Sequence, residues 1–290
     1  MVDQQMLQGR VAVVTGGAGG IGAATCRILA EHGADVVVAD IEEKRAVSVV
    51  RSVAGSGRRA IAVAEDLTMV GAIESLHTRA TEAFGHVDIL VNGLGHHLGT
   101  SGPFEESTEE QWDALYQTNF LHVLRACKVF APAMCQAGWG RIVNFSSVEG
   151  IRAMPHGAVY AAFKGAVDSF TQSLGVALAG RGVRVNCVAV DKVRSEQVGW
   201  YQLPEEYARL APVWIPAGRY GEPDDVAKVV LFLASDMSSW LVGRTIAADG
   251  GTLAAGGWYP TPTRWTNSPL LLQYFEDDPS INERRPRTLQ

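Results

Sequence analysis

Short apolar runs alternate with longer amphipathic stretches along most of the chain. The runs occupy residues 10–15, 36–39, 60–64, 87–91, 141–145, 183–189 and 246–248. Runs that are apolar almost throughout are typical of strands buried on both faces, and the stretches between them are long enough for crossover helices. The pattern therefore predicts the α/β class, with a Rossmann-type doubly wound parallel sheet and helices on both of its faces.

Helices are expected over residues 23–32, 108–135 and 158–179, and from Pro223 onward, because proline suits the first turn of a helix. The second of these helices follows a capping-box pattern at Ser107-Thr108-Glu109-Glu110. Asn119 lies inside it, although asparagine is a mediocre helix former. Asn119 is therefore either a tolerated polar residue or a polar group that disrupts local pairing and positions a water.

A glycine-rich loop from Gly16 to Gly22 joins the first strand to the first helix. Glycines allow a tight turn and let the backbone approach a pyrophosphate at the positive end of the helix, although such a loop alone also fits a flexible turn. Asp40 ends the second strand, where a carboxylate accepts from both ribose hydroxyls of NAD and repels the extra phosphate of NADP. Arg45 is close in sequence, but Asp40 takes the selecting position, so we expect NAD as the cofactor.

Tyr160 and Lys164 are four residues apart on an expected helix and therefore share one face. A cationic neighbour favours the phenolate, so we expect Lys164 to lower the pKa of Tyr160 from its ordinary value of about 10. Ser147 follows the fifth strand and offers a hydroxyl that can donate to a substrate oxygen. A Tyr-x-x-x-Lys pair occurs by chance in many helices, but in this context it predicts a proton-transfer site for an alcohol and its ketone.

Histidines and aromatic residues near the expected strand ends are further candidates. His96 and His97 follow the fourth strand. Adjacent histidines are expected to point in different directions, and without a third ligand they indicate no metal site. His97 is the candidate to face a substrate, because ligands gather at the carboxyl ends of the strands. Residues 190–221 include Trp200 and Trp214 and are rich in apolar side chains, which indicates either a lid over an apolar substrate or a surface used in assembly.

The composition narrows the choice of partners. The 290 residues carry a net charge of −6 without a basic stripe, which argues against nucleic acid. No apolar run approaches the roughly 20 residues that cross a bilayer, and residues 1–10 lack a signal-peptide pattern. The four cysteines form no C-x-x-C pair, which favours reduced thiols over a disulfide framework or a zinc site. We therefore expect a cytoplasmic protein that binds a small-molecule substrate and neither membrane nor nucleic acid.

Over residues 8–256 these motifs together resemble the classical short-chain dehydrogenases/reductases. The matching motifs are the cofactor loop Thr15-Gly16-x-x-x-Gly20-Ile21-Gly22 and the C-terminal signatures Arg219-Tyr220-Gly221-Glu222-Pro223 and Asp249-Gly250-Gly251. The resemblance implies a catalytic tetrad of Asn119, Ser147, Tyr160 and Lys164. It implies cofactor contacts by Gly16, Gly20, Ile21, Gly22, Asp40, Ile41, Asp66, Leu67, Asn92, Gly93, Tyr160, Lys164, Val193 and Ser195. Candidate substrate contacts are His97, Glu149, His156, Trp200 and Trp214.

The resemblance, which ends at about residue 256, and the change in composition after that residue together suggest how the chain is organised. Residues 1–256 would form one NAD-binding domain that includes the catalytic site, and residues 257–290 an irregular C-terminal extension. The extension would wrap a neighbouring subunit or cover the pocket. The two long helices commonly pair across a two-fold axis in this family, so a homotetramer, or a homodimer, is expected.

Three positions depart from the family pattern. The usual Asn-Asn-Ala-Gly appears as Asn92-Gly93-Leu94-Gly95, and the serine before the catalytic lysine is Phe163. After the sixth strand, the usual Pro-Gly is Val190-Asp191, in a segment that normally shapes the nicotinamide pocket.

The expected reaction is the reversible NAD-dependent oxidation of a secondary alcohol to a ketone, with an apolar cyclic or aromatic alcohol, or a ring cis-diol, as substrate. Tyr160 would remove the hydroxyl proton, Ser147 would hold the substrate oxygen, and Asn119 would anchor a water between Lys164 and solvent. One alternative is a carbonyl reductase acting on a 3-oxoacyl thioester, which Asp40 disfavours because biosynthetic reduction uses NADPH. Another is a regulatory protein that binds the cofactor without catalysis.

Overall fold

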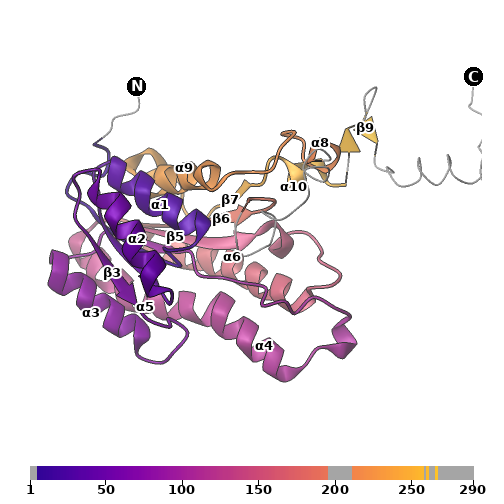
Figure 1. Ribbon diagram of the computed structural model, residues 1–290, viewed down its shortest axis with the longest axis horizontal. Helices are drawn as coiled ribbons and strands as arrows, with labels where there is room; N and C mark the ends of the chain where they lie inside the picture. Colours follow the sequence, from indigo (N-terminus) through magenta and orange to yellow (C-terminus); the bar gives the residue numbers. More distant parts are fainter. Residues whose placement is uncertain (1–4, 195–210, 258, 261–264, 267–290) are drawn as a thin grey trace, which may run out of the picture. The chain divides into compact units, whose positions relative to one another are not determined.

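The computed structural model describes residues 5–194, 211–257, 259–260 and 265–266, and the chain forms two compact units. Residues 1–202 and 221–249 make the first unit, and residues 203–220 and 250–290 the second. The first unit is an α/β fold built on a parallel sheet of seven strands, which confirms the predicted fold class (Figure 1). No helix among the described residues is long and apolar enough to cross a membrane.

The sheet has the strand order β3-β2-β1-β4-β5-β6-β7, and all neighbouring strands are parallel. The strands are β1 (Val11–Thr15), β2 (Asp35–Asp40), β3 (Ala60–Ala64), β4 (Ile89–Asn92), β5 (Gly140–Ser147), β6 (Val183–Val190) and β7 (Thr245–Ala248). Each lies within about two residues of its predicted range. The order reverses between β1 and β4, and in open α/β sheets ligands bind outside the carboxyl ends of the strands at such a switch point.

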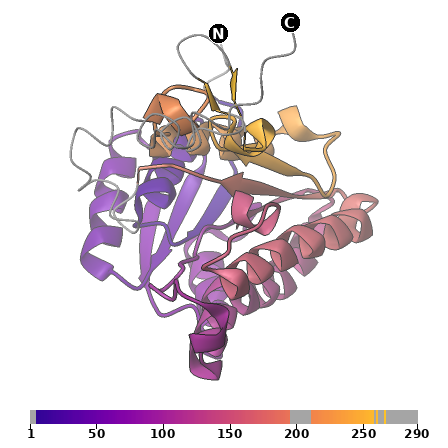
Figure 2. The same ribbon diagram turned by 90° about the vertical axis from the view of Figure 1, so that its right-hand side faces the viewer.

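Helices cover both faces of the sheet, as Figures 1 and 2 show. The first face carries α1 (Gly20–Glu31), α2 (Glu43–Ala54) and α9 (Pro223–Ala234). The second carries α3 (Ala72–Phe84), α5 (His122–Ala137) and α6 (Ala158–Ala179). Strand β1 supplies both cores, because Ala12 and Val14 point to the first face while Val11 and Val13 point to the second. Burying a valine side chain contributes about 1.5–3 kcal/mol.

The long helix expected over residues 108–135 is interrupted. It consists of α4 (Glu109–Tyr116), a π-helical segment at Gln117–Leu121, and α5. Its first turn also starts one residue later than the predicted box: Thr108 Oγ1 accepts from Gln111 N at 3.3 Å, and Gln111 Oε1 accepts from Thr108 N at 3.0 Å. Ser107 does not cap the helix because its hydroxyl accepts from Trp112 Nε1 at 2.8 Å.

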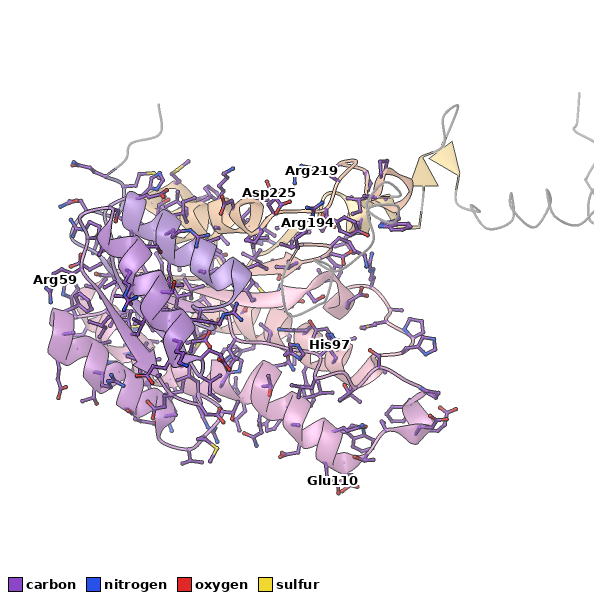
Figure 3. The ribbon with its side chains drawn as sticks, in the orientation of Figure 1. Arg59, His97, Glu110, Arg194, Arg219 and Asp225 are labelled. Atoms are coloured by element: carbon purple, nitrogen blue, oxygen red, sulfur yellow. The ribbon has the colours of Figure 1, made fainter. Side chains whose placement is uncertain are left out.

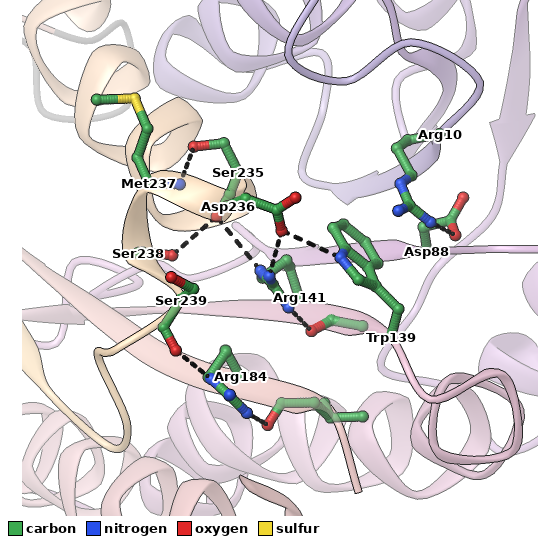
Figure 4. A network of polar contacts seen from close by, with 12 residues as sticks. Arg10, Asp88, Trp139, Arg141, Arg184, Ser235, Asp236, Met237, Ser238 and Ser239 are labelled. Carbon is green, nitrogen blue, oxygen red and sulfur yellow. Dashed lines mark hydrogen bonds and ion pairs between the residues drawn. The ribbon is translucent and has the colours of Figure 1, made fainter.

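A network of polar contacts joins β5 to the chain after α9 (Figure 4). Arg141, with 4% of its surface exposed, donates to Asp236 Oδ1 at 2.6 Å and to Ser235 O at 3.3 Å. Trp139 lies between the guanidinium groups of Arg10 and Arg141, whose Cζ atoms are 3.6 and 4.3 Å from ring centroids. Because these residues stand at the amino ends of β1 and β5, the network is on the opposite edge of the sheet from the strand ends that bind ligands.

The second unit is small in its described part. It holds α8 (Ala211–Trp214), α10 (Thr252–Ala255) and a pair of two-residue antiparallel strands, β8 (Tyr259–Pro260) and β9 (Trp265–Thr266). Ser195, Trp200 and most of the proposed lid lie outside the described residues. The domain boundary at residue 256 and the role of the extension stay predictions.

Candidate active site

The glycine loop after β1 is packed too tightly for side chains. A Cβ added to Gly22 would lie 2.0 Å from the carbonyl oxygen of Gly16. Helix α1 begins at Gly20, three residues before the predicted start, so its first turn forms the wall of a cavity, which we call the glycine-loop cavity. Its lining includes Gly16, Gly20, Ile21, Gly22, Gly93, Tyr160 and Lys164. The buried Thr25 hydroxyl, also in this lining, has no hydrogen-bond partner within the described structure.

A second cavity, the Asp40 cavity, adjoins the first at Gly16. Its lining includes Asp40, Ile41, Asp66 and Leu67. Asp40 Oδ2 accepts from the loop amide of Ala18 at 2.9 Å, and its Oδ1 accepts from Glu42 N at 3.0 Å. The backbone therefore fixes this carboxylate at the rim of the cavity. Five of the residues predicted to contact the cofactor are brought together here: Gly16, Asp40, Ile41, Asp66 and Leu67.

A third cavity, the Ser147 cavity, has a volume of about 350 Å³ and shares Ile21, Ser146, Tyr160 and Val190 with the glycine-loop cavity. Ser147 and Tyr160 line it together, as do Val193 and the candidates His97 and Glu149. The three cavities thus adjoin one another from Asp40 to Ser147 and share lining residues at each junction. A row of this kind fits a dinucleotide with its reacting end beside a substrate.

Lys164 lies on α6 one turn after Tyr160, as the four-residue spacing predicts. It is 4% exposed, its Nζ donates to Phe145 O at 3.2 Å, and Nζ lies 5.7 Å from the centroid of the Tyr160 ring. Burial lowers the pKa of Lys164 to about 8, although Cys187 and Asp168 oppose this change. Its ammonium charge therefore titrates close to neutral pH.

The prediction that Lys164 brings the pKa of Tyr160 below its ordinary value is wrong for the protein by itself. Burial raises the pKa of Tyr160 to about 12. A hydrogen bond with Ser147 opposes the rise, whereas the carboxylates of Glu149 and Asp191 add to it. Tyr160 is therefore a neutral phenol at pH 7, ready to give a proton rather than to take one.

Asn119 lies in the π-helical segment and is fully buried. Its Nδ2 donates to Leu115 O at 3.0 Å and to His96 O at 2.9 Å, and its Oδ1 accepts from His96 N at 3.1 Å. The side chain thus bridges the π-helical segment to the loop after β4, in agreement with the interpretation of Asn119 as a polar group that disrupts local pairing. π-helical turns inside α-helices occur frequently at functional sites. The water that Asn119 would position stays a prediction.

Gly95 connects this bridge to the lysine. A Cβ at Gly95 would lie 2.6 Å from Lys164 Nζ and 3.2 Å from Asn119 Oδ1. Only a residue without a side chain therefore leaves the ammonium group where it is. The motif that contains Gly95 was visible in the sequence, but its contact with Lys164 was not.

The two histidines after β4 do not diverge as expected. Their rings stack with centroids 4.9 Å apart and an interplanar angle of 17°. Each Nδ1 accepts a backbone amide two residues ahead: that of His96 from Leu98 at 2.7 Å, and that of His97 from Gly99 at 3.1 Å. The resulting tight turn, with Leu98 at φ +54°, orients both rings. His97, labelled in Figure 3, lines the Ser147 cavity.

Other candidates are placed separately. His156 lines a small cavity beside Tyr160, together with Phe104 and Trp112. The fully buried Asn92 donates from Nδ2 to Asn144 Oδ1 at 2.8 Å, and its side chain lines none of the three connected cavities. Trp214 belongs to α8 in the second unit.

Comparison with known proteins adds independent information. A family model described as enoyl-(acyl carrier protein) reductase matches residues 16–252. The 3-oxoacyl-(acyl-carrier-protein) reductase FabG of Thermotoga maritima is 36% identical over 245 residues, 84% of this chain and 98% of that protein. The cis-4-hydroxycyclohexanecarboxylate dehydrogenase of Sinomonas cyclohexanicum is 38% identical over 245 residues, 84% and 97% of the two chains. The crystal structure of levodione reductase matches with a TM-score of 0.80 at 29% identity, over 86% of this chain and 99% of that one.

Proposed function

The chain belongs to the classical short-chain dehydrogenases/reductases and is an oxidoreductase, and from this premise we propose that it interconverts a secondary alcohol and its ketone with NAD as the cofactor. The observation that carries the proposal is the row of three adjoining cavities with Asp40 at one end and Ser147 and Tyr160 at the other. Family membership alone supports a nicotinamide cofactor. Asp40 supports NAD over NADP.

The residues present fit such a cofactor. The closely packed glycine loop leaves backbone at the surface of the cavity, and the Asp40 carboxylate is held ready to accept ribose hydroxyls. Gly16, Gly20, Ile21, Gly22 and Gly93 would hold the cofactor along the glycine-loop cavity, with Asp66 and Leu67 at the Asp40 end. When bound, the nicotinamide ring supplies the carbon that exchanges hydride with the substrate.

The protein groups supply the proton transfer. In oxidation the Tyr160 phenolate takes the hydroxyl proton of the substrate, and in reduction the Tyr160 phenol returns it. Ser147 Oγ donates to the substrate oxygen, where negative charge develops. Lys164 has a pKa of about 8 and can therefore change its charge near neutral pH. It relays the proton from Tyr160 towards solvent on the side of Asn119. The high pKa of Tyr160 makes the oxidation direction faster in alkaline solution.

A ring-borne alcohol is the proposed substrate class, because the similar dehydrogenase of Sinomonas cyclohexanicum is named for a substrate with a hydroxycyclohexane ring. Reduction of a 3-oxoacyl thioester is the second candidate. It is favoured by the Thermotoga maritima relative and by the neutral Tyr160, which suits a proton donor. A non-catalytic protein has no need of Ser147 and Lys164 in adjoining cavities that share Tyr160. The cytoplasmic location and the homotetramer stay proposals.

Replacement of Tyr160 by Phe tests the assignment. Tyr160→Phe keeps the ring and removes only the hydroxyl, so we expect turnover to be lost while NADH still binds with unchanged affinity. Turnover would be measured as NADH formation, and binding as a fluorescence titration with NADH. Retained turnover in the variant would overturn the role of Tyr160.

A further inference from the structure

The Ser147 cavity has one strongly polar wall. Glu149 lies in the 3-10 turn Val148–Gly150 after β5, and Asp191 directly follows β6. Both residues line the cavity. Their side chains are only 18% and 8% exposed, so each carboxylate is largely withdrawn from bulk water.

Arg152 ties the two carboxylates together. Its Nε and Nη2 donate to Glu149 Oε2 and Oε1 at 3.2 and 2.8 Å, and Nη2 also donates to Asp191 Oδ2 at 2.9 Å. Lys192 Nζ lies 3.7 Å from Asp191 Oδ1. Lys192 also lines the cavity, whereas Arg152 is not among the lining residues. Each carboxylate oxygen can accept more than one hydrogen bond, and the pair therefore offers oriented acceptors to a molecule in the cavity.

The wall adjoins the reacting position. The Ser147 hydroxyl donates to Val190 O at 3.3 Å and accepts from Glu149 N at 3.2 Å. The two backbone segments that carry the carboxylates thus meet at this hydroxyl. Glu149 and Asp191 line the same cavity as Ser147 and Tyr160, and both carboxylates act electrostatically on the Tyr160 hydroxyl.

We propose that Glu149 and Asp191 form an acceptor subsite for a second hydroxyl of the substrate, which selects vicinal ring diols over ring monoalcohols. The inference rests on the proposed oxidation of a secondary alcohol at Ser147 and Tyr160, and narrows its substrate class. When a substrate enters the cavity, the carboxylates lose hydrogen bonds to water. A hydroxyl on the carbon next to the reacting carbon donates new hydrogen bonds in their place, whereas a methylene group at that position cannot. Only the first hydroxyl gives its proton to Tyr160 and its carbon gives up hydride to NAD, so the product is an α-hydroxyketone.

The test compares two substrates that differ by one hydroxyl, cis-1,2-cyclohexanediol and cyclohexanol, as kcat/KM for NADH formation. Loss of a hydrogen bond to a charged group costs roughly tenfold or more in efficiency. We therefore expect the wild-type protein to prefer the diol by about tenfold or more, and Glu149→Gln and Asp191→Asn each to lower this ratio by about tenfold. Asp113→Asn removes an exposed carboxylate on α4 and should leave the ratio unchanged.

The ratio separates the subsite from other effects, because a general loss of activity in a variant changes both substrates alike. The wild-type ratio also needs no variant to fold. Equal efficiencies on the two substrates, or a ratio that both variants leave intact, would overturn the subsite while the proposed oxidation stands. Failure to form NADH with any secondary alcohol would overturn the proposed function and the subsite together.

Discussion

Gly95→Ala should damage catalysis far more than it damages folding. The added Cβ would lie 2.6 Å from Lys164 Nζ, whereas unbonded heavy atoms rest at roughly 3.5–4.0 Å. The clash falls on the far end of a flexible side chain, so the ammonium group is pushed aside by about 1 Å while the backbone stays in place. Asn119 Oδ1 would lie 3.2 Å from the same Cβ, so the Cβ cannot move away from Lys164 Nζ in that direction.

The size of the effect follows from that displacement. A misplacement of about 1 Å costs roughly 100-fold in rate, which corresponds to about 2.7 kcal/mol in the activation barrier. The change in the free energy of unfolding is small by comparison. Replacing glycine by alanine restricts the unfolded chain and so stabilises the folded state by about 0.4–1 kcal/mol, which offsets part of the destabilisation by the clash. We therefore expect kcat/KM to fall about 100-fold and the free energy of unfolding to change by less than about 1 kcal/mol.

The assay pairs NADH formation with urea unfolding in the same preparation. Gly180→Ala serves as the control, because Gly180 caps the same helix α6 with φ −66° and its added Cβ meets nothing within 4 Å. The control should keep its full kcat/KM. An active Gly95→Ala variant would refute the positioning of Lys164, and so would a loss of activity that merely tracks a large loss of stability.

Three further predictions concern charge. Asp40→Asn keeps an acceptor for Ala18 N but removes the charge, so the ratio of kcat/KM with NAD to that with NADP should fall by about tenfold or more; an unchanged ratio would contradict the selecting role of Asp40. Alcohol oxidation should accelerate as the pH rises towards about 12, because burial raises the pKa of Tyr160 to about 12 and its phenolate forms progressively below that value. Asp191→Asn should lower the pKa of Tyr160 and move this limb to lower pH; a profile that stays in place would contradict the role of Tyr160 as the base. Asp236→Asn should lower the free energy of unfolding by about 1 kcal/mol, because the ion pair joins the buried Arg141 to the exposed Asp236. The value of kcat should not change, and a large drop in kcat would contradict the separation of this network from the active site.

The arrangement of strands and helices could be predicted because strands that are buried on both faces consist of continuous apolar runs, which are recognisable in the sequence. The helix that contains Asn119 was expected to be continuous, since intrinsic propensities describe single residues and not the bridge from Asn119 to the loop after β4. The start of α4 differed by one residue because a glutamine, Gln111, closes the capping box.

The site was predicted at the level of residues that a local pattern identifies, such as Tyr160 and Lys164. What could not be predicted depends on contacts between distant segments. Arg152 and Asp191 are 39 residues apart, and only the pairing of β5 with β6 brings their segments together. The raised pKa of Tyr160 has the same origin, because burial and the carboxylates of Glu149 and Asp191 outweigh the hydrogen bond with Ser147.

The most direct test of the account is NADH formation by the purified protein with NAD and a panel of ring alcohols and diols, run in parallel with NADP. The account predicts oxidation of at least one ring alcohol with NAD and markedly weaker activity with NADP. Tight NADH binding without oxidation of any alcohol would contradict it, and so would activity with NADP alone.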